Sequence, residues 1–445
     1  MRFSGFRELV DHMAAERGDA VALVHGDGCS EVTWAAFAEA VRARADQLSS
    51  EDARCEAIVS DGSFGCVVEV FAANRAGRAI VMLDESLNEQ LRIALCDATG
   101  ADALWADGSA KTLNRTRPFS TSAGEMLFFT SGTTSRSKAV VLSDASLMAS
   151  AWNGSAILPL SEDDRLLCML PLSHVFGFVC GLLWGLSCGA TVALGRGPRH
   201  YVDDCLHFRP TAVSLVPMLL DFLLGHRLMN PELALVLVGA GDCSEERLAQ
   251  VRALGIRVAF GYGLTETSSG VALAAGDDLR AMAVCPDDTI AIADDGEILV
   301  EAPTCMMKGY LGRPEETAEV LRDGVLHTGD LGFLDDDGCL HVTGRKKDIL
   351  VLPSGTKIFL PEYEAAIRAT LTCDEVAVVL SGGRPVLVTA EELGSRDEVL
   401  GRLAPLMAEQ PRSSQLADVR VLGHKLPRTA TGKVKRWEIQ KEIDA

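Results

Sequence analysis

The segment from Thr130 to Lys138 combines hydroxyls, a glycine and two cations in a pattern that suits the binding of phosphate. It reads Thr-Ser-Gly-Thr-Thr-Ser-Arg-Ser-Lys and lies between two apolar runs, 125–129 and 139–142, each of which predicts a strand. Backbone N–H groups and hydroxyls can donate hydrogen bonds to phosphate oxygens there, and the cations can neutralise charge. The spacing from Gly132 to Lys138 is not that of a Walker A loop. A polar hairpin loop without a ligand is the alternative interpretation.

A second segment places an aromatic ring between two glycines, followed by a hydroxyl and a carboxylate. It reads Gly-Tyr-Gly-Leu-Thr-Glu over residues 261–266. The ring of Tyr262 can stack on adenine, and the oxygens of Thr265 and Glu266 suit a Mg²⁺ ion that bridges phosphates. The alternative is a strand end followed by a helix, with Thr265 as the N-cap and Glu266 favoured by the helix dipole.

Two further segments each present one charged group of interest. Over 327–331 the sequence His-Thr-Gly-Asp-Leu predicts a tight turn that carries Asp330, whose carboxylate can accept hydrogen bonds from both hydroxyls of a ribose. Residues 426–436 predict a basic loop that contains Lys433. Ordinary turns and solvated basic loops have similar sequences, so neither segment identifies a site alone.

Short apolar runs alternate with amphipathic helical stretches along most of the chain. A helix is predicted over 64–76, and another is predicted to begin at a capping box formed by Ser86 and Glu89. Strands are predicted at 56–59, 79–83, 165–170, 211–216, 233–238 and 257–260. This alternation predicts an α/β fold whose large N-terminal domain holds helix-covered, mostly parallel sheets.

From about Met282 the pattern changes to short strands joined by Asp-Gly turns, at 291–295, 297–301 and 338–343. These strands predict a small β-barrel-like part of the large domain. A charged hinge follows at 344–348, and the residues beyond it suffice for a small mobile α+β domain. We therefore divide the chain into residues 1–346 and 347–445.

Composition restricts the class of protein. The 445 residues exceed what one hydrophobic core usually supports, and a formal net charge of -20 disfavours nucleic acid or anionic lipid as the main partner. The 13 cysteines are scattered without a Cys-x-x-Cys pair, which is typical of reduced thiols. The first residues carry no apolar leader. We therefore expect a cytoplasmic protein.

An uncharged stretch from Val175 to Leu194 is long enough to span a membrane, and glycines recur in it at every fourth position. The residues at 187–189 instead favour a break between a buried helix and a short strand at 190–194. The glycines would then let the helix lie close to a sheet. Since no basic cluster marks a cytoplasmic flank, we expect no transmembrane segment.

In this order and over most of the chain, the segments resemble the motifs of the superfamily of acyl-CoA synthetases, peptide-synthetase adenylation domains and luciferases. Similarity extends to 171–177, beside that family's acyl pocket, to 239–241, where the family contacts adenine, and to 308–317, before its ribose-binding aspartate. Residues 344–348 resemble its hinge. The resemblance implies an enzyme that uses ATP to activate a carboxylic acid as an acyl-adenylate and passes the acyl group to a thiol.

The resemblance also implies roles for single residues. Lys433 would reach the α-phosphate and the carboxylate during adenylation, with His174, Thr265 and Glu266 as further catalytic residues and Glu266 as the Mg²⁺ ligand. The residues implied in ATP binding are Thr130, Ser131, Gly132, Thr133, Thr134, Lys138, Gly239, Ala240, Gly241, Tyr262, Gly263, Thr265, Asp330 and Arg345. Those implied in the acyl pocket are His174, Phe176, Gly177, Val216 and Gly270. Lys347 takes the hinge position, at which the family's small domain rotates after adenylation.

The phosphate loop departs from the family pattern at three positions. Ser135, Ser137 and Ala139 stand where the family usually has glycine, proline and glycine. Fewer glycines stiffen a loop, so the affinity for ATP or the rate is expected to differ.

The acid and the thiol are less closely specified. Amino-acid-activating relatives usually carry an aspartate soon after the motif at His174, whereas 175–183 hold no acidic side chain, so an uncharged aliphatic or aryl tail is expected. Residues 344–352 most resemble bacterial fatty-acid–CoA ligases. Coenzyme A is the first choice of acceptor, and because no carrier domain is expected after Ala445, a free acyl carrier protein is the alternative. A non-catalytic relative that binds AMP or an acyl group is a second alternative.

Overall fold

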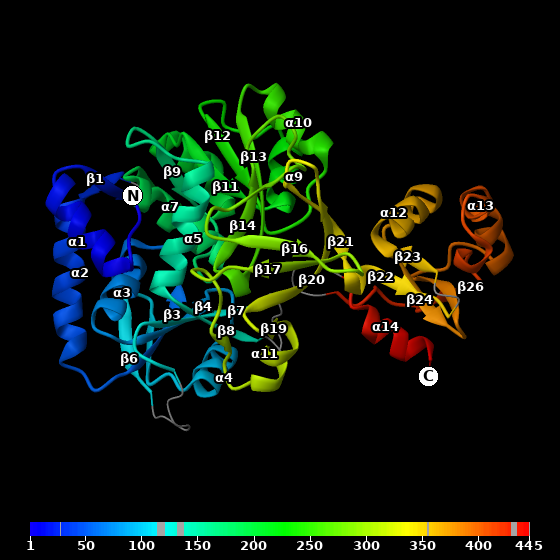
Figure 1. Ribbon diagram of the computed structural model, residues 1–445, viewed down its shortest axis with the longest axis horizontal. Helices are drawn as coiled ribbons and strands as arrows, with labels where there is room; N and C mark the ends of the chain where they lie inside the picture. Colours follow the sequence, from blue (N-terminus) through cyan, green and yellow to red (C-terminus); the bar gives the residue numbers. More distant parts are fainter. Residues whose placement is uncertain (27, 114–120, 131–137, 354–355, 429–433, 445) are drawn as a thin grey trace. The chain divides into compact units, whose positions relative to one another are not determined.

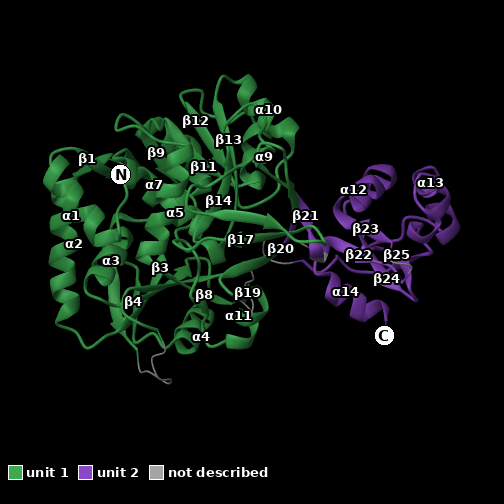
Figure 2. Cartoon of the chain, viewed as in Figure 1, with its two compact units in different colours: residues 1–130, 138–328, 332–342 green, residues 131–137, 329–331, 343–445 purple. Residues whose placement is uncertain are grey.

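The computed structural model describes residues 1–445 except 27, 114–120, 131–137, 354–355, 429–433 and 445 (Figure 1). The chain forms two compact units, coloured separately in Figure 2. The first comprises Met1–Thr130, Lys138–Thr328 and Gly332–Val342, and the second comprises Gly329–Leu331 and the described part of Thr343–Ala445. The boundary at residues 346 and 347 stays a prediction of where the mobile domain begins.

Two large sheets of the first unit contain the predicted parallel strands. In spatial order, one consists of β18 (Gly309–Tyr310), β8 (Ala139–Ser143), β7 (Glu125–Phe129), β4 (Ala79–Asp84), β3 (Cys55–Ser60), β5 (Ala103–Ala106) and β6 (Ser109–Thr112). The other consists of β15 (Ala283–Val284), β14 (Ser269–Ala274), β13 (Arg257–Leu264), β12 (Leu235–Val238), β11 (Ala212–Leu215), β9 (Arg165–Cys168), β10 (Thr191–Leu194), β1 (Val21–His25) and β2 (Ser30–Thr33). The run from β13 to β1 is parallel throughout.

Helices cover these sheets. They are α1 (Phe6–Arg17), α2 (Trp34–Ser49), α3 (Phe64–Arg75), α4 (Glu89–Thr99), α5 (Asp144–Ile157), α6 (Val175–Phe178), α7 (Trp184–Cys188), α8 (Tyr201–Phe208), α9 (Pro217–Gly225), α10 (Glu245–Ala253) and α11 (Pro314–Val320). Helix α5 begins directly after β8 of one sheet and packs against β14 of the other (Figure 1).

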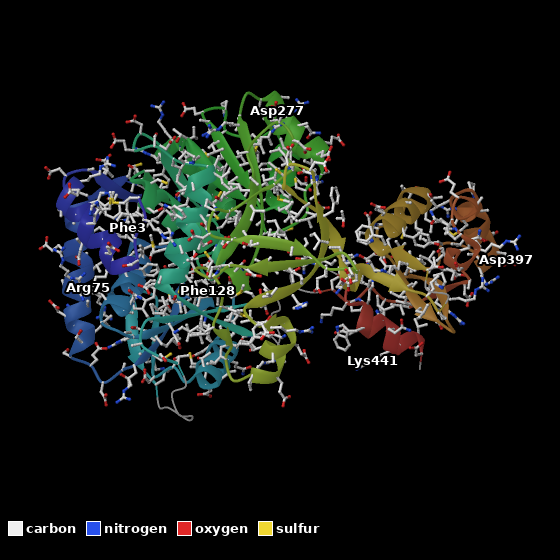
Figure 3. The ribbon with its side chains drawn as sticks, in the orientation of Figure 1. Phe3, Arg75, Phe128, Asp277, Asp397 and Lys441 are labelled. Atoms are coloured by element: carbon white, nitrogen blue, oxygen red, sulfur yellow. The ribbon has the colours of Figure 1, made fainter. Side chains whose placement is uncertain are left out.

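Burial of both faces explains why the parallel strands are continuous apolar runs rather than alternating ones. All residues of 79–83 in β4 are buried. Ile80 and Met82 belong to the main core of the first unit, whereas Val81 and Leu83 belong to a second core on the opposite face. Phe128 of β7 is fully buried in the main core and is labelled in Figure 3.

The small sheet of the first unit and the second unit follow in sequence. The small sheet consists of β16 (Thr289–Ile292), β17 (Glu297–Glu301), β20 (Val325–Leu334) and β19 (Leu321–Arg322), with β21 (Leu340–Arg345) beside β20. The second unit contains β22 (Ile349–Val351), β23 (Lys357–Phe359), α12 (Leu360–Leu371), β24 (Val376–Ser381), β25 (Arg384–Thr389), α13 (Arg396–Ala408), β26 (Asp418–Val421) and α14 (Arg436–Ile443). The predicted fold class is confirmed.

The uncharged stretch from Val175 to Leu194 is a helical segment that ends before a short strand, as predicted. It forms α6, a π-helical turn at Val179–Leu183, α7 and then β10, and Gly189 ends α7 with a left-handed φ of 76°. A Cβ atom at Gly185 would lie 2.6 Å from Val192 Cγ2, so the glycine does allow close packing on the sheet. Among the described residues, no helix has the length and apolar character needed to cross a membrane.

Two local predictions were wrong. Helix α4 is capped not by Ser86 but by Asn88, whose side chain accepts from Leu91 N at 2.9 Å. The hydroxyl of Ser86 donates to Asp84 Oδ1 instead. Residues 327–331 do not form a tight turn but lie within strand β20, where Gly329 takes a left-handed φ of 71°. A left-handed residue at that position therefore does not end the strand.

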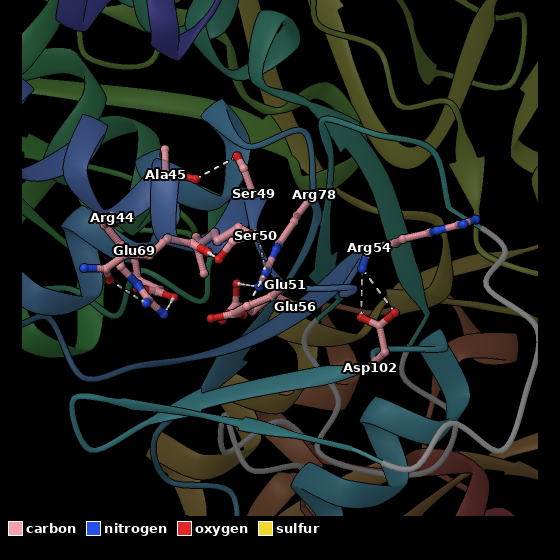
Figure 4. A network of polar contacts seen from close by, with 12 residues as sticks. Arg44, Ala45, Ser49, Ser50, Glu51, Arg54, Glu56, Glu69, Arg78 and Asp102 are labelled. Atoms are coloured by element: carbon pink, nitrogen blue, oxygen red, sulfur yellow. Dashed lines mark hydrogen bonds and ion pairs between the residues drawn. The ribbon is translucent and has the colours of Figure 1, made fainter.

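A buried network of ions joins α2, α3 and β3 (Figure 4). Arg78 Nη1 donates to Glu56 Oε2 at 3.0 Å, and its Nη2 donates to Glu51 at 2.9 Å. Arg44 donates to both oxygens of Glu69 at 2.6 and 2.7 Å. Burial, together with the nearby charge of Glu69, raises the pKa of Glu56 to about 8, although Arg78 opposes the shift.

We expect this network to make stability depend on pH. The folded protein keeps a proton on Glu56 that the unfolded chain releases at about pH 4.3, so the free energy of unfolding should fall as pH rises from there to about 8. Glu56→Gln should flatten this decline by on the order of 1–3 kcal/mol in denaturant titrations at several pH values. Glu39→Gln, at an exposed position of α2, is the control. Parallel curves for Glu56→Gln and the native protein would contradict the assignment.

Candidate active site

Most predicted site residues of the first unit follow the carboxyl ends of parallel strands. His174 follows β9, Val216 follows β11, Gly239 follows β12 and Tyr262 lies near the end of β13. The four strands are neighbours in one sheet. Since parallel strands point the same way, their ends and the residues after them gather along one edge, where α/β proteins bind ligands.

Close contacts at this edge require small residues. A Cβ atom at Gly239 would lie 2.8 Å from Phe176 Cε2, so this predicted adenine-binding glycine contacts the predicted acyl-pocket ring. Gly177 is equally restricted, because a Cβ there would lie 2.3 Å from the backbone oxygen of Pro171. Gly241 lies beside Pro217, to which a Cβ would come within 3.4 Å.

Strands β13 and β14 bring Gly263 and Gly270 together. They are register partners next to a bulge between Tyr262 and Gly263. A Cβ atom at Gly263 would lie 1.8 Å from Ser269 O, whereas one at Gly270 would meet nothing nearer than Tyr262 O at 3.9 Å. Only glycine therefore fits at 263, and the space in front of Gly270 is open to a larger group.

The π-helical turn after α6 places a thiol beside these strands. Ser214 Oγ of β11 donates to Cys180 O at 2.8 Å, which satisfies a carbonyl of the turn. Cys180 Sγ lies 3.5 Å from Ser269 Oγ. Although part of Cys180 reaches the surface, burial raises the pKa of its thiol to about 11, and burial raises that of Cys168, the last residue of β9, to about 12.

His174 lies near a carboxylate that the sequence analysis missed. Its Nε2 is 3.9 Å from Asp84 Oδ2, which also accepts from Ser173 Oγ at 2.8 Å. Burial raises the pKa of Asp84, but hydrogen bonds from Ser86 and Ser173 outweigh it and hold the pKa below its ordinary value. Asp84 ends a strand of the other large sheet, and an aspartate directly after an apolar run was the available signal.

The predicted phosphate loop leaves the sheet between β7 and β8. Thr130 N donates to Lys138 O at 3.1 Å, and Lys138 N donates to Thr130 Oγ1 at 3.3 Å, so the two ends of the loop are hydrogen-bonded. Ser131, Gly132, Thr133 and Thr134 lie outside the described residues. Lys138 Nζ lies 3.0 Å from Glu316 Oε2 and 4.3 Å from the centre of the Tyr310 ring.

Glu266 lies in a short 3₁₀ turn, Thr265–Thr267, after β13. Its Oε1 accepts a 2.7 Å hydrogen bond from the hydroxyl of Tyr310, and its backbone oxygen accepts from Met307 N at 2.8 Å. The donor set suits Mg²⁺, which prefers carboxylate and hydroxyl oxygens. No cluster of three His, Cys, Asp or Glu side chains fit for a metal occurs within the described part of the chain.

The predicted ribose-binding residue pairs with an arginine in the second unit. Arg345 Nε lies 2.8 Å from Asp330 Oδ1, with the Asp330 side chain 3% exposed and that of Arg345 55% exposed. Lys347 lies in the 3₁₀ turn Lys346–Asp348 that follows. Lys433 lies outside the described residues.

Comparison with known proteins identifies the family of the chain. The family model described as AMP-binding enzyme matches residues 120–311. An indoleacetate–CoA ligase from Aromatoleum aromaticum is 31% identical over 345 residues, which cover 72% of this chain and 67% of the relative. The chain belongs to the AMP-binding enzyme family. A feruloyl-CoA synthase from Amycolatopsis is likewise 31% identical to this AMP-binding enzyme, over 72% of its chain and 70% of the relative.

Solved structures show the same fold. The O-succinylbenzoate coenzyme A synthetase from Bacillus subtilis, in complex with AMP, aligns with a TM-score of 0.79 at 24% identity, covering 97% of this AMP-binding enzyme and 98% of that chain. ATP-bound MatB from Rhodopseudomonas palustris aligns with a TM-score of 0.79 at 20% identity over 100% and 99%. The predicted class, an AMP-forming acid–thiol ligase, is confirmed at the level of the family.

The contact between Gly239 and Phe176 gives a prediction for acid binding. Gly239→Ala should push the ring from its place, because the added carbon would lie 2.8 Å from it. We expect the KM for the acid to rise about tenfold, while the protein remains folded by circular dichroism. Gly154→Ala, where an added Cβ meets nothing within 4 Å, is the matched control and should leave the KM unchanged. An unaltered KM for Gly239→Ala would contradict the assignment of Phe176 to the acyl pocket.

Proposed function

We propose that this AMP-binding enzyme activates an aryl acid as its acyl-adenylate and transfers the acyl group to coenzyme A. ATP and Mg²⁺ serve adenylation, and coenzyme A is the second co-substrate. Three relatives support the choice of acid class, because the names of the indoleacetate, ferulate and 2-succinylbenzoate enzymes each specify an aryl acid and coenzyme A. The fatty acid suggested by residues 344–352 becomes the second choice.

One observation carries the choice of an acid with an uncharged tail. Phe176, which contacts Gly239, carries no charge, and neither do Gly177, Val216 and Gly270 of the predicted acyl pocket. A charged tail placed among them would lose its hydration without gaining a partner. An aryl ring instead gains contact with the face or edge of Phe176.

Cationic residues of this chain would offset the electrostatic repulsion that opposes adenylation. A carboxylate that attacks the α-phosphate brings two anions together, and negative charge grows on the phosphoryl oxygens in the transition state. Lys138 and the loop before it would hold the outer phosphates, and Lys433 would stabilise the charge at the α-phosphate. A Mg²⁺ ion held by Glu266 and Thr265 would neutralise further phosphate charge.

Other residues would position the nucleotide. Tyr262 would stack on adenine beside Gly239, Ala240 and Gly241. Asp330 would accept hydrogen bonds from the ribose hydroxyls and is oriented by Arg345, its ion-pair partner at 2.8 Å. His174 would lie at the acyl group, with Asp84 as its nearest carboxylate.

After adenylation the thiol of coenzyme A would attack the acyl carbon, and AMP would leave. We assign the change between the two half-reactions to rotation at Lys347, which removes Lys433 from the adenylation site. We place the reaction in the cytoplasm, where ATP and coenzyme A are available and where thiols stay reduced; none of the thirteen cysteines, all of them described, forms a disulfide.

The deciding experiment measures pyrophosphate and AMP release from ATP and Mg²⁺ with a panel of aryl, short, medium and long aliphatic acids, with and without coenzyme A. Turnover that needs an aryl acid and accelerates with coenzyme A is expected. Turnover with fatty acids alone would show that the substrate is a fatty acid and not an aryl acid. Adenylation without stimulation by coenzyme A would indicate an acyl carrier protein as the acceptor. No release with any acid would support a non-catalytic relative. The first variants to test would then carry the family's usual glycine, proline and glycine in place of Ser135, Ser137 and Ala139.

Lys433 should matter for one half-reaction only. Lys433→Ala should lower the rate of acyl-adenylate formation by at least about a hundredfold, because a charge that stabilises the transition state is lost. Thioester formation from pre-made acyl-adenylate and coenzyme A should remain largely intact. Lys435→Ala removes a neighbouring lysine that pairs with Glu438 at 3.1 Å and should change neither rate. Equal loss of both half-reactions in Lys433→Ala would contradict this role.

A further inference from the structure

Tyr310 contacts two predicted ATP-binding residues that lie far apart in the sequence. Its hydroxyl donates to Glu266 Oε1 at 2.7 Å, and Lys138 Nζ lies 4.3 Å from the centre of its ring. All three residues belong to the first unit. One buried side chain, 7% exposed, therefore touches the predicted metal carboxylate with its hydroxyl and the predicted phosphate cation with its ring.

The backbone holds Tyr310 in this place. Strand β18 pairs Tyr310 with Val140 of β8, the strand that begins directly after Lys138. Its N–H donates to Thr317 Oγ1 at 2.9 Å. On the other side, Met307 N donates to the backbone oxygen of Glu266 at 2.8 Å. The turn that carries Glu266 and the start of β8 are thus bound to the same short segment.

The hydroxyl of Tyr310 acts as a donor under ordinary conditions. Its 2.7 Å hydrogen bond to Glu266 Oε1 engages one oxygen of that carboxyl group. That bond fixes the plane of the carboxylate, which a metal ion needs.

Lys138 has a second contact, which a phosphate would have to displace. Its Nζ lies 3.0 Å from Glu316 Oε2, while Arg313 Nη1 donates to Glu316 Oε1 at 2.8 Å. Hydrogen bonds from Lys138 and Arg313 lower the pKa of Glu316, so it is an anion at neutral pH. A phosphate that approaches Lys138 competes with this carboxylate, and Arg313 remains to pair with Glu316 after the exchange.

We propose that Tyr310 is a positioning residue for ATP binding, which orients Glu266 toward Mg²⁺ and steadies the Lys138 ammonium, and that Glu316 is the counter-ion which Lys138 exchanges for an ATP phosphate. The inference rests on the proposed function for the roles of Glu266 and Lys138. It does not depend on which acid the enzyme uses.

Calorimetric titration of ATP into the full-length protein, repeated over a series of Mg²⁺ concentrations and without acid or coenzyme A, tests the inference. Tyr310→Phe keeps the ring and loses the hydroxyl. Its Kd for ATP should rise about tenfold at low Mg²⁺ and approach that of the native protein at saturating Mg²⁺, because only the orientation of Glu266 is affected. Tyr310→Leu also loses the ring and should bind ATP more weakly at every Mg²⁺ concentration.

Glu316→Gln should have the opposite effect. Without the competing carboxylate, Lys138 is available to phosphate, and ATP should bind several-fold more tightly. Because the Glu316 side chain is 36% exposed, this variant is expected to fold normally.

Tyr201→Phe is the matched control for Tyr310→Phe, since Tyr201 is a buried tyrosine of the same unit whose hydroxyl accepts from Asn230 N at 3.3 Å. It should leave the dependence on Mg²⁺ unchanged.

The outcomes separate the inference from the proposed function. If the native protein binds no ATP at any Mg²⁺ concentration, the proposed function fails, and the inference fails with it. If the native protein binds ATP but Tyr310→Phe shows the same Mg²⁺ dependence as Tyr201→Phe, the role of Tyr310 alone is overturned. Weaker ATP binding by Glu316→Gln would overturn the role of Glu316 as a counter-ion.

Discussion

The burial of parallel strands on both faces is the constraint on which the rest of the structure depends. A strand covered on both sides can expose functional groups only where it ends, and neighbouring parallel strands end along the same edge. The residues after β9, β11, β12 and β13 therefore meet, although they are separated by many positions in the sequence. Crowding at this edge accounts for glycine at 239 against Phe176 and at 263 against Ser269.

Three charged groups among the described residues of the candidate site have partners within the protein. Lys138 is paired with Glu316, Arg345 with Asp330, and Glu266 accepts from a tyrosine. In a protein of net charge -20, such pairs hold the cations in place within a generally negative field. Nucleotide binding would then exchange one set of anions for another, which costs less than the desolvation of isolated charges.

The sequence predicted the parts of the fold that local pattern determines. Apolar runs located β3, β4 and the strands from β7 to β13, but not β5 and β6, and the glycines of 177–189 indicated a helix packed closely on a sheet. The capping box at Ser86 was wrong because Asn88 lies nearer the helix, and the turn at 327–331 was wrong because strand β20 continues through the left-handed Gly329. A local sequence pattern does not show which of two nearby residues caps a helix, or whether a glycine ends a strand.

Contacts between residues far apart in the chain could not be predicted from the sequence. Glu266 and Tyr310 lie 44 positions apart, and Asp84 and His174 belong to segments of different sheets. Resemblance to a family identified most candidate residues one by one, but it gave no contact between them. Their roles in ATP and acid binding remain predictions, and the pairings of Lys138 and Glu266 through Tyr310 appear only once β18 is placed beside β8.

The buried thiols described beside β9 and the π-helical turn bear on chemical selectivity. An acyl-adenylate is an acylating agent, and the nucleophile it must meet is the thiolate of a co-substrate. Cys180 Sγ lies 3.5 Å from Ser269 Oγ, next to Gly270 of the predicted acyl pocket, yet burial keeps the pKa values of Cys180 and Cys168 at about 11 and about 12, so at neutral pH both thiols are almost wholly protonated. The low dielectric of the core thus makes the protein's own sulfur atoms poor acceptors, and the activated acid is kept for a thiol that arrives from solution.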